Sequence, residues 1–200
     1  MLKKIILWVL AVLAIAFVAA VIIRIPYVNE KKKTDEAVVK IHSTKLTLDD
    51  VLGKNLPAAP NPAEADKTVA GIDANDNGIR DDVEIAIFNA YPDSAKTRAV
   101  LLQYALALQT EMTLPLVNTE TVTATIEDNE SRALNCVWSI SSRADMNKFM
   151  EGTTANEDFV KNRQFNTDQR KQALSDLLKK LGSYSVSHGD CDIALSTLPN

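Results

Sequence analysis

The 200-residue sequence contains little glycine and little tyrosine, with six and four residues respectively. This scarcity argues against a turn-rich β-sandwich, whose many short strands need glycine in the turns and aromatic residues in the strands. Basic residues are also in deficit: 22 Lys and Arg stand against 26 Asp and Glu, giving a formal net charge of −4. Because Lys and Arg that neutralise phosphates drive nucleic-acid binding, we expect no nucleic-acid partner.

Motifs of known enzyme classes are missing as well. The sequence has no Gly-x-Ser-x-Gly, no His-Glu-x-x-His and no phosphate-binding glycine loop. Its two histidines, His42 and His188, fall in segments that we expect to be a stalk and a tail. The sequence therefore favours a non-enzymatic protein. The alternative is an exported, hydrolase-like enzyme without a recognisable motif.

An uninterrupted run of nineteen apolar residues, 5–23, follows Lys3 and Lys4. At 1.5 Å per residue, a helix of this length nearly spans a hydrocarbon core of ~30 Å. No cysteine follows the run, which excludes a bacterial lipoprotein. We expect residues 1–26 to be a transmembrane signal anchor, with residues 5–23 in the membrane.

A cleaved signal peptide is the alternative to this anchor. The tripeptides 14–16 and 18–20 end in alanine and are acceptable cleavage sites. The apolar run nevertheless continues through residues 21–23, which a cleaved peptide does not need. The length of the run therefore favours an uncleaved anchor.

Residues 27–70 are expected to be a stalk and a proline-rich linker. The first part, 27–45, is mostly polar, and residues 46–52 are expected to form one or two helical turns. Three prolines follow within residues 56–62, where each fixes φ and removes a hydrogen-bond donor.

The remainder, residues 71–200, is expected to fold as one small α-helical domain, so the fold class is all-α. Apolar residues recur at helical spacing after residue 81, and a proline at 92 ends that helix. Asp93 or Ser94 is expected to cap the next helix, which runs to about Met112. Since this helix is apolar on nearly all sides, we expect it at the centre of a bundle.

The second half of this domain is less regular in sequence. The β-branched residues of 121–125 could form a strand. Helical spacing then predicts a helix over about 128–150. Asn166 and Gln169 resemble a capping box before the last long helix, and Gly182 is expected to end it.

One segment, residues 73–84, has the spacing of a calcium loop. Calcium takes six to eight oxygen ligands, and a twelve-residue loop supplies them from positions 1, 3, 5, 7, 9 and 12, with glycine at position 6. Gly78 is at that position. A plain turn with a helix cap would explain Gly78 and Asp81, but not the remaining ligands in register. We predict a calcium site formed by Asp73, Asn75, Asn77, the Ile79 carbonyl, Asp81 and Glu84.

The loop resembles the EF-hand-like calcium motifs of bacterial exported proteins, including the thrombospondin type 3 and dockerin kinds. The string 71–84 is also similar to a signature of uncharacterised bacterial envelope proteins. The resemblance covers only these residues and implies calcium binding but no enzyme activity. Position 8 is Arg80, where EF-hands that pair have an apolar residue, and there is no second loop. We therefore expect a structural clip that binds calcium weakly, with Kd about 10⁻⁴ to 10⁻³ M.

The two cysteines, Cys136 and Cys191, are expected to form a disulfide, with a buried free thiol as the alternative for Cys136. Basic residues lie on both sides of the apolar run, so the positive-inside rule does not decide the orientation. A disulfide and a calcium loop favour a compartment that is oxidising and rich in calcium. We therefore expect a single-pass inner- or plasma-membrane protein whose domain is periplasmic or extracellular and binds another envelope protein.

Overall fold

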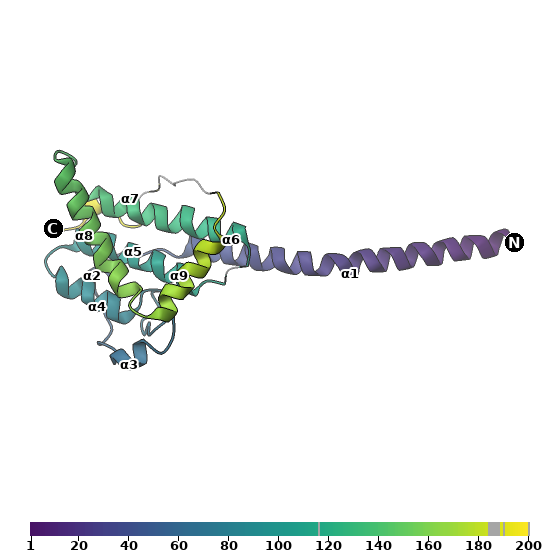
Figure 1. Ribbon diagram of the computed structural model, residues 1–200, viewed down its shortest axis with the longest axis horizontal. Coiled ribbons are helices and arrows are strands. Elements are labelled where there is room, and N and C mark those ends of the chain that lie inside the picture. The colour runs from purple at the N-terminus through teal and green to yellow at the C-terminus, as the bar shows by residue number, and fades with distance from the viewer. Residues whose placement is uncertain (116, 184–188, 190, 200) are drawn as a thin grey trace. The chain divides into compact units, whose positions relative to one another are not determined.

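The computed structural model describes residues 1–115, 117–183, 189 and 191–199, and no strand occurs in these ranges. The chain forms two compact units, Met1–Glu36 and Ala37–Asn200 (Figure 1). The predicted all-α class is confirmed. The predicted division into an anchor (1–26), a stalk and linker (27–70) and a domain (71–200) stays a prediction.

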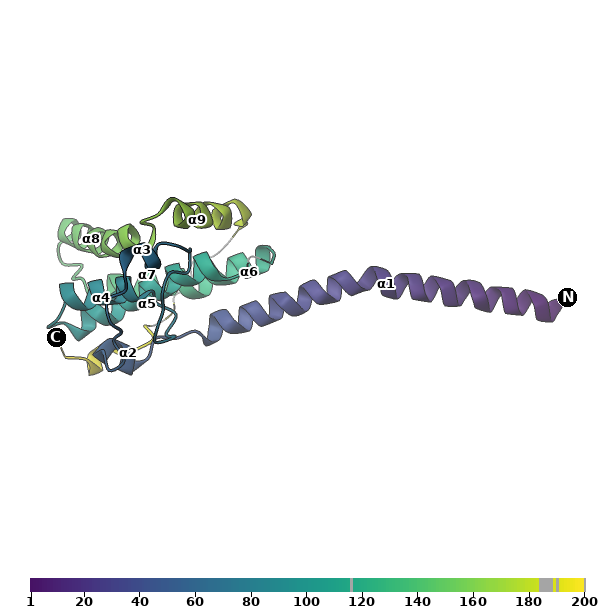
Figure 2. The same cartoon turned by 90° about the horizontal axis from the view of Figure 1, so that it is seen from below.

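The first unit consists of one helix, α1 (Leu2–Ser43), whose last turns belong to the second unit. In the described ranges, α1 is the single helix long and apolar enough to cross a membrane. Pro26 lies inside α1 and does not end it, although it cannot donate to the carbonyl one turn earlier. Figure 2 shows that α1 is bent. The stalk expected after residue 27 is therefore helical as far as Ser43.

The second unit is a helical bundle. Its long helices are α4 (Asp81–Ala90), α5 (Ala95–Thr113), α7 (Ser131–Ser139), α8 (Met146–Gln164) and α9 (Asp168–Lys180). Its short helices are α2 (Leu48–Leu52), α3 (Pro62–Ala65), α6 (Thr119–Ala124), the π-helix η1 (Thr125–Glu130) and the 3₁₀-helix η2 (Leu195–Thr197). The helical turns expected in 46–52 are present as α2.

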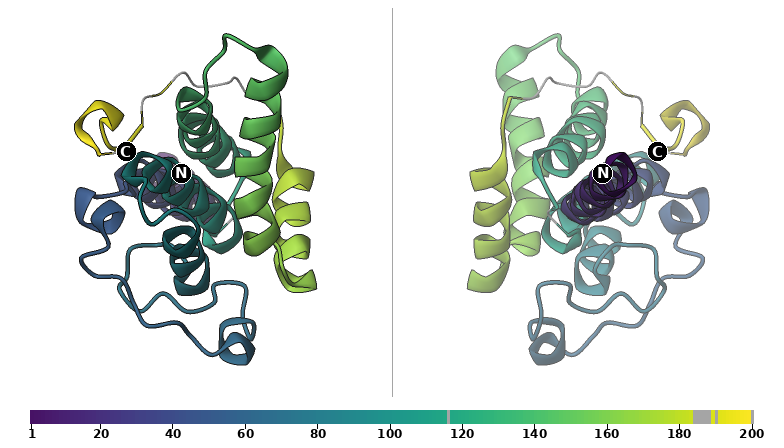
Figure 3. Two further views of the ribbon diagram at one scale, coloured as in Figure 1. Left: turned by 90° about the vertical axis from the view of Figure 1, so that its left-hand side faces the viewer. Right: turned by 90° about the vertical axis from the view of Figure 1, so that its right-hand side faces the viewer.

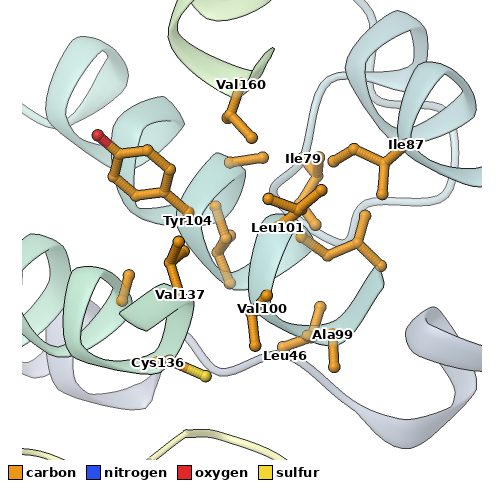
Figure 4. Packing of buried hydrophobic residues seen from close by; sticks show 14 of the residues in the cluster. Leu46, Ile79, Ile87, Ala99, Val100, Leu101, Tyr104, Cys136, Val137 and Val160 are labelled. Carbon is orange, nitrogen blue, oxygen red and sulfur yellow. The ribbon is translucent and has the colours of Figure 1, made fainter. Parts of the chain in front are cut away.

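Helix α5 lies at the centre of this bundle, as its sequence predicts. It contacts α2, α4, α7, α8, α9 and η1, and sixteen of its nineteen residues are buried. Ser94 caps it by accepting a hydrogen bond from the Thr97 amide. Figure 3 shows α8 and α9 on one side of α5 and α2 on the other. Figure 4 shows the apolar side chains of several elements meeting around α5, among them Ile79, Val137 and Val160.

The strand predicted for residues 121–125 is wrong. These residues form α6 and the start of η1. Asn118 caps α6 by accepting from the Thr121 amide, which favours a helix locally. Val122 and Ile126, four residues apart, then pack on Leu177 of α9. Tertiary packing on one helical face thus outweighs the β propensity of the threonines.

The helix predicted over 128–150 is also partly wrong, because it is interrupted. Helix α7 ends at Ser139, and α8 starts at Met146 after Asp145, which caps it by accepting from two backbone amides. The predicted capping box at Asn166 and Gln169 is wrong, because Thr167, one residue later, caps α9 by accepting from the Arg170 amide. Gly182 follows the end of α9, but its φ is not positive.

Polar side chains of α5 hold the irregular parts of the chain. Gln109 donates to the Ala70 carbonyl at 2.7 Å. Gln103 accepts from the Asp192 amide at 2.8 Å. Arg98 donates to the Val51 carbonyl at 3.1 Å. The central helix therefore fixes three segments that lack long helices of their own.

The C-terminal segment is attached to the bundle at two adjacent points. Cys136 of α7 and Cys191 form a disulfide, with Cα atoms 5.1 Å apart. The side chain of Asp192 accepts from the Leu46 amide and forms an ion pair with Arg132. This segment therefore joins the start of the second unit to α7.

Isolation without reductant is expected to give a protein with no titratable thiol. The double variant Cys136→Ala/Cys191→Ala is expected to lose about 4 kcal/mol of unfolding free energy, because the bridge closes a loop between residues 55 apart. Urea denaturation with and without reductant measures this loss. Two free thiols in freshly isolated protein would contradict the pairing.

Glu111, near the end of α5, is a buried acid without full hydrogen bonding. Glu111 is 2% exposed, and its Oε1 atom has no hydrogen-bond partner among the described residues. Burial raises the pKa of Glu111 well above its ordinary value, and Glu130 of η1 raises that pKa further, while Lys161 opposes the rise. The proton held by this pair therefore belongs to the folded state.

Glu111→Gln should stabilise the protein more at pH 8 than at pH 5. A carboxyl whose folded pKa is raised stabilises the fold below its unfolded pKa, about 4.3, and this contribution is lost as pH rises through the folded pKa. The side-chain amide of the glutamine variant cannot ionise, so the variant does not lose this stabilisation as the pH rises. Denaturation at both pH values measures the difference, and Glu120→Gln, at an exposed residue of α6, is the control. Equal effects of the two variants would disprove the raised pKa.

Candidate metal site

Two buried arginines attach the predicted loop, and the stretch without long helices before it (residues 66–72), to the helices around them. Both Arg80 and Arg170 are fully buried, and such side chains need a complete set of acceptors. Because the loop has little regular structure of its own, these contacts fix its position.

Arg170 of α9 binds the chain just before the loop. It donates to the carbonyls of Ala65 at 2.6 Å, Thr68 at 3.0 Å and Val69 at 3.1 Å. It also forms an ion pair with Asp66 at 2.6 Å. The hydrogen bond from Arg170 holds the pKa of Asp66 below its ordinary value.

Arg80, at position 8 of the loop, binds α8 instead of a second loop. Its guanidinium pairs with Asp82 through Nε and Nη2. Nη2 also donates to the Arg163 carbonyl at 2.7 Å, close to the C-terminus of α8. A Cβ atom on Gly71, whose φ is +69°, would come within 2.3 Å of the Arg80 side chain. Glycine at 71 therefore leaves room for the arginine.

The loop itself turns around the carboxylate of Asp73. This group accepts from the backbone amides of Asn77 at 3.1 Å and Gly78 at 2.8 Å. Gly78 has a φ of +83°, and a Cβ there would lie 2.7 Å from Leu106 of α5. The sharp reversal expected at loop position 6 is thus present, and only glycine fits it.

Two further predicted ligands are buried acids. Asp81 is 1% exposed and accepts from the Ala74 amide at 3.0 Å, and burial raises its pKa. Glu84 is also 1% exposed and accepts from the side-chain amides of Asn75 at 3.2 Å and Asn77 at 3.0 Å. Burial raises the pKa of Glu84 to about 7, and these two hydrogen bonds offset part of the rise.

Neither Glu84 nor Asp81 forms an ion pair with any lysine or arginine among the residues that the structure describes, and Arg80 pairs with Asp82 instead. A buried carboxylate without a counter-charge is costly, so these acids favour a cation or a proton. The loop therefore has negative charge that the lysines and arginines of the described ranges do not neutralise.

The amide of Asn75 has one unsatisfied atom. Its nitrogen donates to the Asn55 carbonyl at 3.2 Å and to Glu84, whereas its buried Oδ1 has no hydrogen-bond partner in the described part of the chain. Asn77 Oδ1 accepts from the Ile79 amide at 2.8 Å, and the Ile79 side chain is fully buried in the core. If the side-chain amide of either asparagine rotated by half a turn, its nitrogen and oxygen would exchange places. The oxygen would then face Glu84.

The structure thus brings the predicted residues into one loop, but it does not gather their carboxylates around one point. Across the described ranges, no group of three or more His, Cys, Asp or Glu side chains is arranged to hold a metal ion. Asp73, Asp81 and Glu84 each accept from a different set of amides. The donor set itself, all oxygen with an unsatisfied Asn75 Oδ1, fits a hard cation such as calcium.

Comparison of the chain with protein-family models, with curated proteins and with solved structures finds no match. The interpretation of the loop therefore depends on its residues and geometry alone.

Sequence reasoning missed the residues that hold the loop in place. Arg80 departs from the EF-hand pattern in sequence, but its contact with α8 spans 83 positions and leaves no local signal. From the sequence alone, Arg170 looks like an ordinary surface residue, because it lies near the polar start of α9. A fully buried arginine becomes recognisable only when the carbonyls around it are known.

Arg80→Lys is expected to lower the unfolding free energy by about 2 kcal/mol, measured by urea denaturation. Lysine keeps the charge but cannot pair with Asp82 through two nitrogens and reach the Arg163 carbonyl at once. The matched control is Arg143→Lys, at an exposed arginine whose guanidinium lies 5.3 Å from the centre of the Phe149 ring; a lysine ammonium can also make this contact, so the change should stay within about 0.5 kcal/mol. An equal effect at both positions would show that the contact with α8 is unimportant.

Proposed function

We propose that this chain is a membrane-anchored, non-enzymatic protein whose folded domain binds one calcium ion in the loop 73–84. The supporting observation is the pair of buried carboxylates, Asp81 and Glu84, that no basic side chain among the described residues neutralises, in register with the remaining ligands of a calcium loop. The ligands would be Asp73, Asn75, Asn77, the Ile79 carbonyl, Asp81 and Glu84.

The role proposed for the ion is structural. Calcium supplies a positive charge and draws together six to eight oxygens. In this chain those oxygens come from the turn 73–79 and from the first turn of α4. Arg80, between them, already attaches the same segment to α8. An ion in the loop would therefore stabilise the junction between α4 and α8 and would open no helix pair, unlike a sensor EF-hand.

The compartment follows from the same proposal. The apolar part of α1 provides the membrane anchor, and a disulfide is stable in an oxidising environment. A weak calcium site is filled only where free calcium is abundant, at about 10⁻³ M. We therefore place the domain outside the cytoplasm, in the periplasm or the extracellular space. Its partner is expected to be another envelope protein.

Calcium is expected to raise the melting temperature of the full chain in detergent. An ion that binds only the folded state adds RT ln(1 + [Ca²⁺]/Kd), which is about 2.7 kcal/mol when calcium exceeds Kd a hundredfold. For a domain of this size, such a gain corresponds to several degrees. Magnesium should raise the melting temperature less, because it requires a smaller octahedral shell.

Two variants distinguish the loop from other calcium effects. Glu84→Gln removes the closing carboxylate and should abolish most of the calcium-dependent gain. Without calcium it should fold at least as well, because it removes a buried charge. Asp76→Asn is the control, because Asp76 is not a predicted ligand and its φ of 55° suits asparagine. This variant should keep the calcium-dependent gain. A melting curve that calcium does not move, or a full gain in Glu84→Gln, would refute the calcium site.

A further inference from the structure

A polar cleft of about 530 Å³ lies in the second unit beside the calcium loop. Three parts of the chain form its walls: the end of α1 with the N-terminus of α2, the loop residues 73 and 75–78, and the last two turns of α5. A volume of this size is in the range of small-ligand sites. The cleft differs from most such sites because its lining is mainly polar.

Each hydroxyl group that lines the cleft donates a hydrogen bond to another group of the protein. Those of Ser43 and Thr44 both donate to the Lys40 carbonyl. Those of Thr110 and Thr113 donate to carbonyls one turn earlier in α5, each at 2.8 Å. Thr47 donates to Asp50 at 2.6 Å. Thr47 Oγ1 already accepts from the Asp50 amide at 3.3 Å, whereas the oxygens of Ser43, Thr44, Thr110 and Thr113 remain as hydrogen-bond acceptors, so a matching ligand must bring several donors.

The charges in the cleft argue for a neutral ligand. Three carboxylates, of Asp50, Asp73 and Asp76, and two ammonium groups, of Lys40 and Lys45, line it, so their formal sum is −1. That sum is too small to select a multiply charged molecule. Lys40 pairs with no acid in the described part of the chain, so its ammonium can donate to a ligand oxygen.

We propose that this cleft binds a polyhydroxylated ligand of the saccharide class. Sugar hydroxyls would donate to the threonine oxygens and to Asp76, and one sugar oxygen would accept from Lys40. Leu106 and Leu114, the two leucines of the lining, offer apolar surface to sugar C–H groups. The proposal uses the loop as a wall and does not require the calcium ion.

The test applies the full chain to an array of immobilised neutral hexoses and N-acetylhexosamines, in lauryldimethylamine oxide. Detergents with sugar head groups are avoided because they would compete for the cleft. We expect retention on at least one class of glycan. Thr44→Val and Thr113→Val keep the side-chain size but remove an acceptor, so each should weaken retention about threefold to tenfold.

The matched control is Thr197→Val. This exposed threonine also donates to a backbone carbonyl three residues earlier, at 2.7 Å, but it lies outside the cleft. Lack of retention on every glycan, or equal retention by the cleft variants and the control, would overturn the proposal. Retention that the cleft variants weaken would support it.

Running the array with calcium and with a chelator separates this proposal from the calcium site. Glycan retention in the chelator, together with a melting temperature that calcium does not change, would support the saccharide cleft and refute the calcium site. A calcium-dependent melting shift without glycan retention would support the calcium site and refute the saccharide cleft. Each proposal can therefore fail while the other stands.

Discussion

Helix α5 is buried on nearly all sides, so its polar side chains cannot rely on water and need partners within the protein. Gln103 Oε1 and Gln109 Nε2 find theirs in the backbone of the C-terminal segment and of the chain before the loop, while the other amide atom of each side chain has no partner in the described part of the chain. Gln164 of α8 in turn donates to the Ala105 carbonyl of α5 at 2.8 Å. The central helix thus determines both how the helices pack and where the irregular segments lie.

The same constraint explains why the loop region has acids without counter-charges. The fully buried Arg80 and Arg170 donate hydrogen bonds to backbone carbonyls. They also form ion pairs with the exposed or half-exposed acids Asp82 and Asp66. They therefore fix the chain around the loop without neutralising Asp81 or Glu84. A buried carboxylate without a counter-charge costs several kcal/mol, and a proton or a cation removes that cost.

Local patterns in the sequence predicted the parts of the fold that local physics controls. The apolar run, the position of α5 at the centre of the bundle and the glycine turn of the loop each follow from a short pattern. The break between α7 and α8 was missed because helical spacing continues across it, and only the cap at Asp145 marks the new start. The strand predicted at 121–125 failed because packing on Leu177, far along the chain, decides the conformation.

The candidate site shows the same division between local and distant information. Ligand spacing along twelve residues is local, so the sequence alone predicts Asp73 to Glu84 as a calcium loop. The hydrogen bonds that direct Asn75 and Asn77 toward Glu84, and the contact of Gly78 with Leu106, depend on where the loop lies against α5. Asn75 also donates to the Asn55 carbonyl, so one amide links the chain before α3 to the buried acid of α4. Any turn of that amide toward a cation would release this link, and the segment around Asn55 would then need another donor.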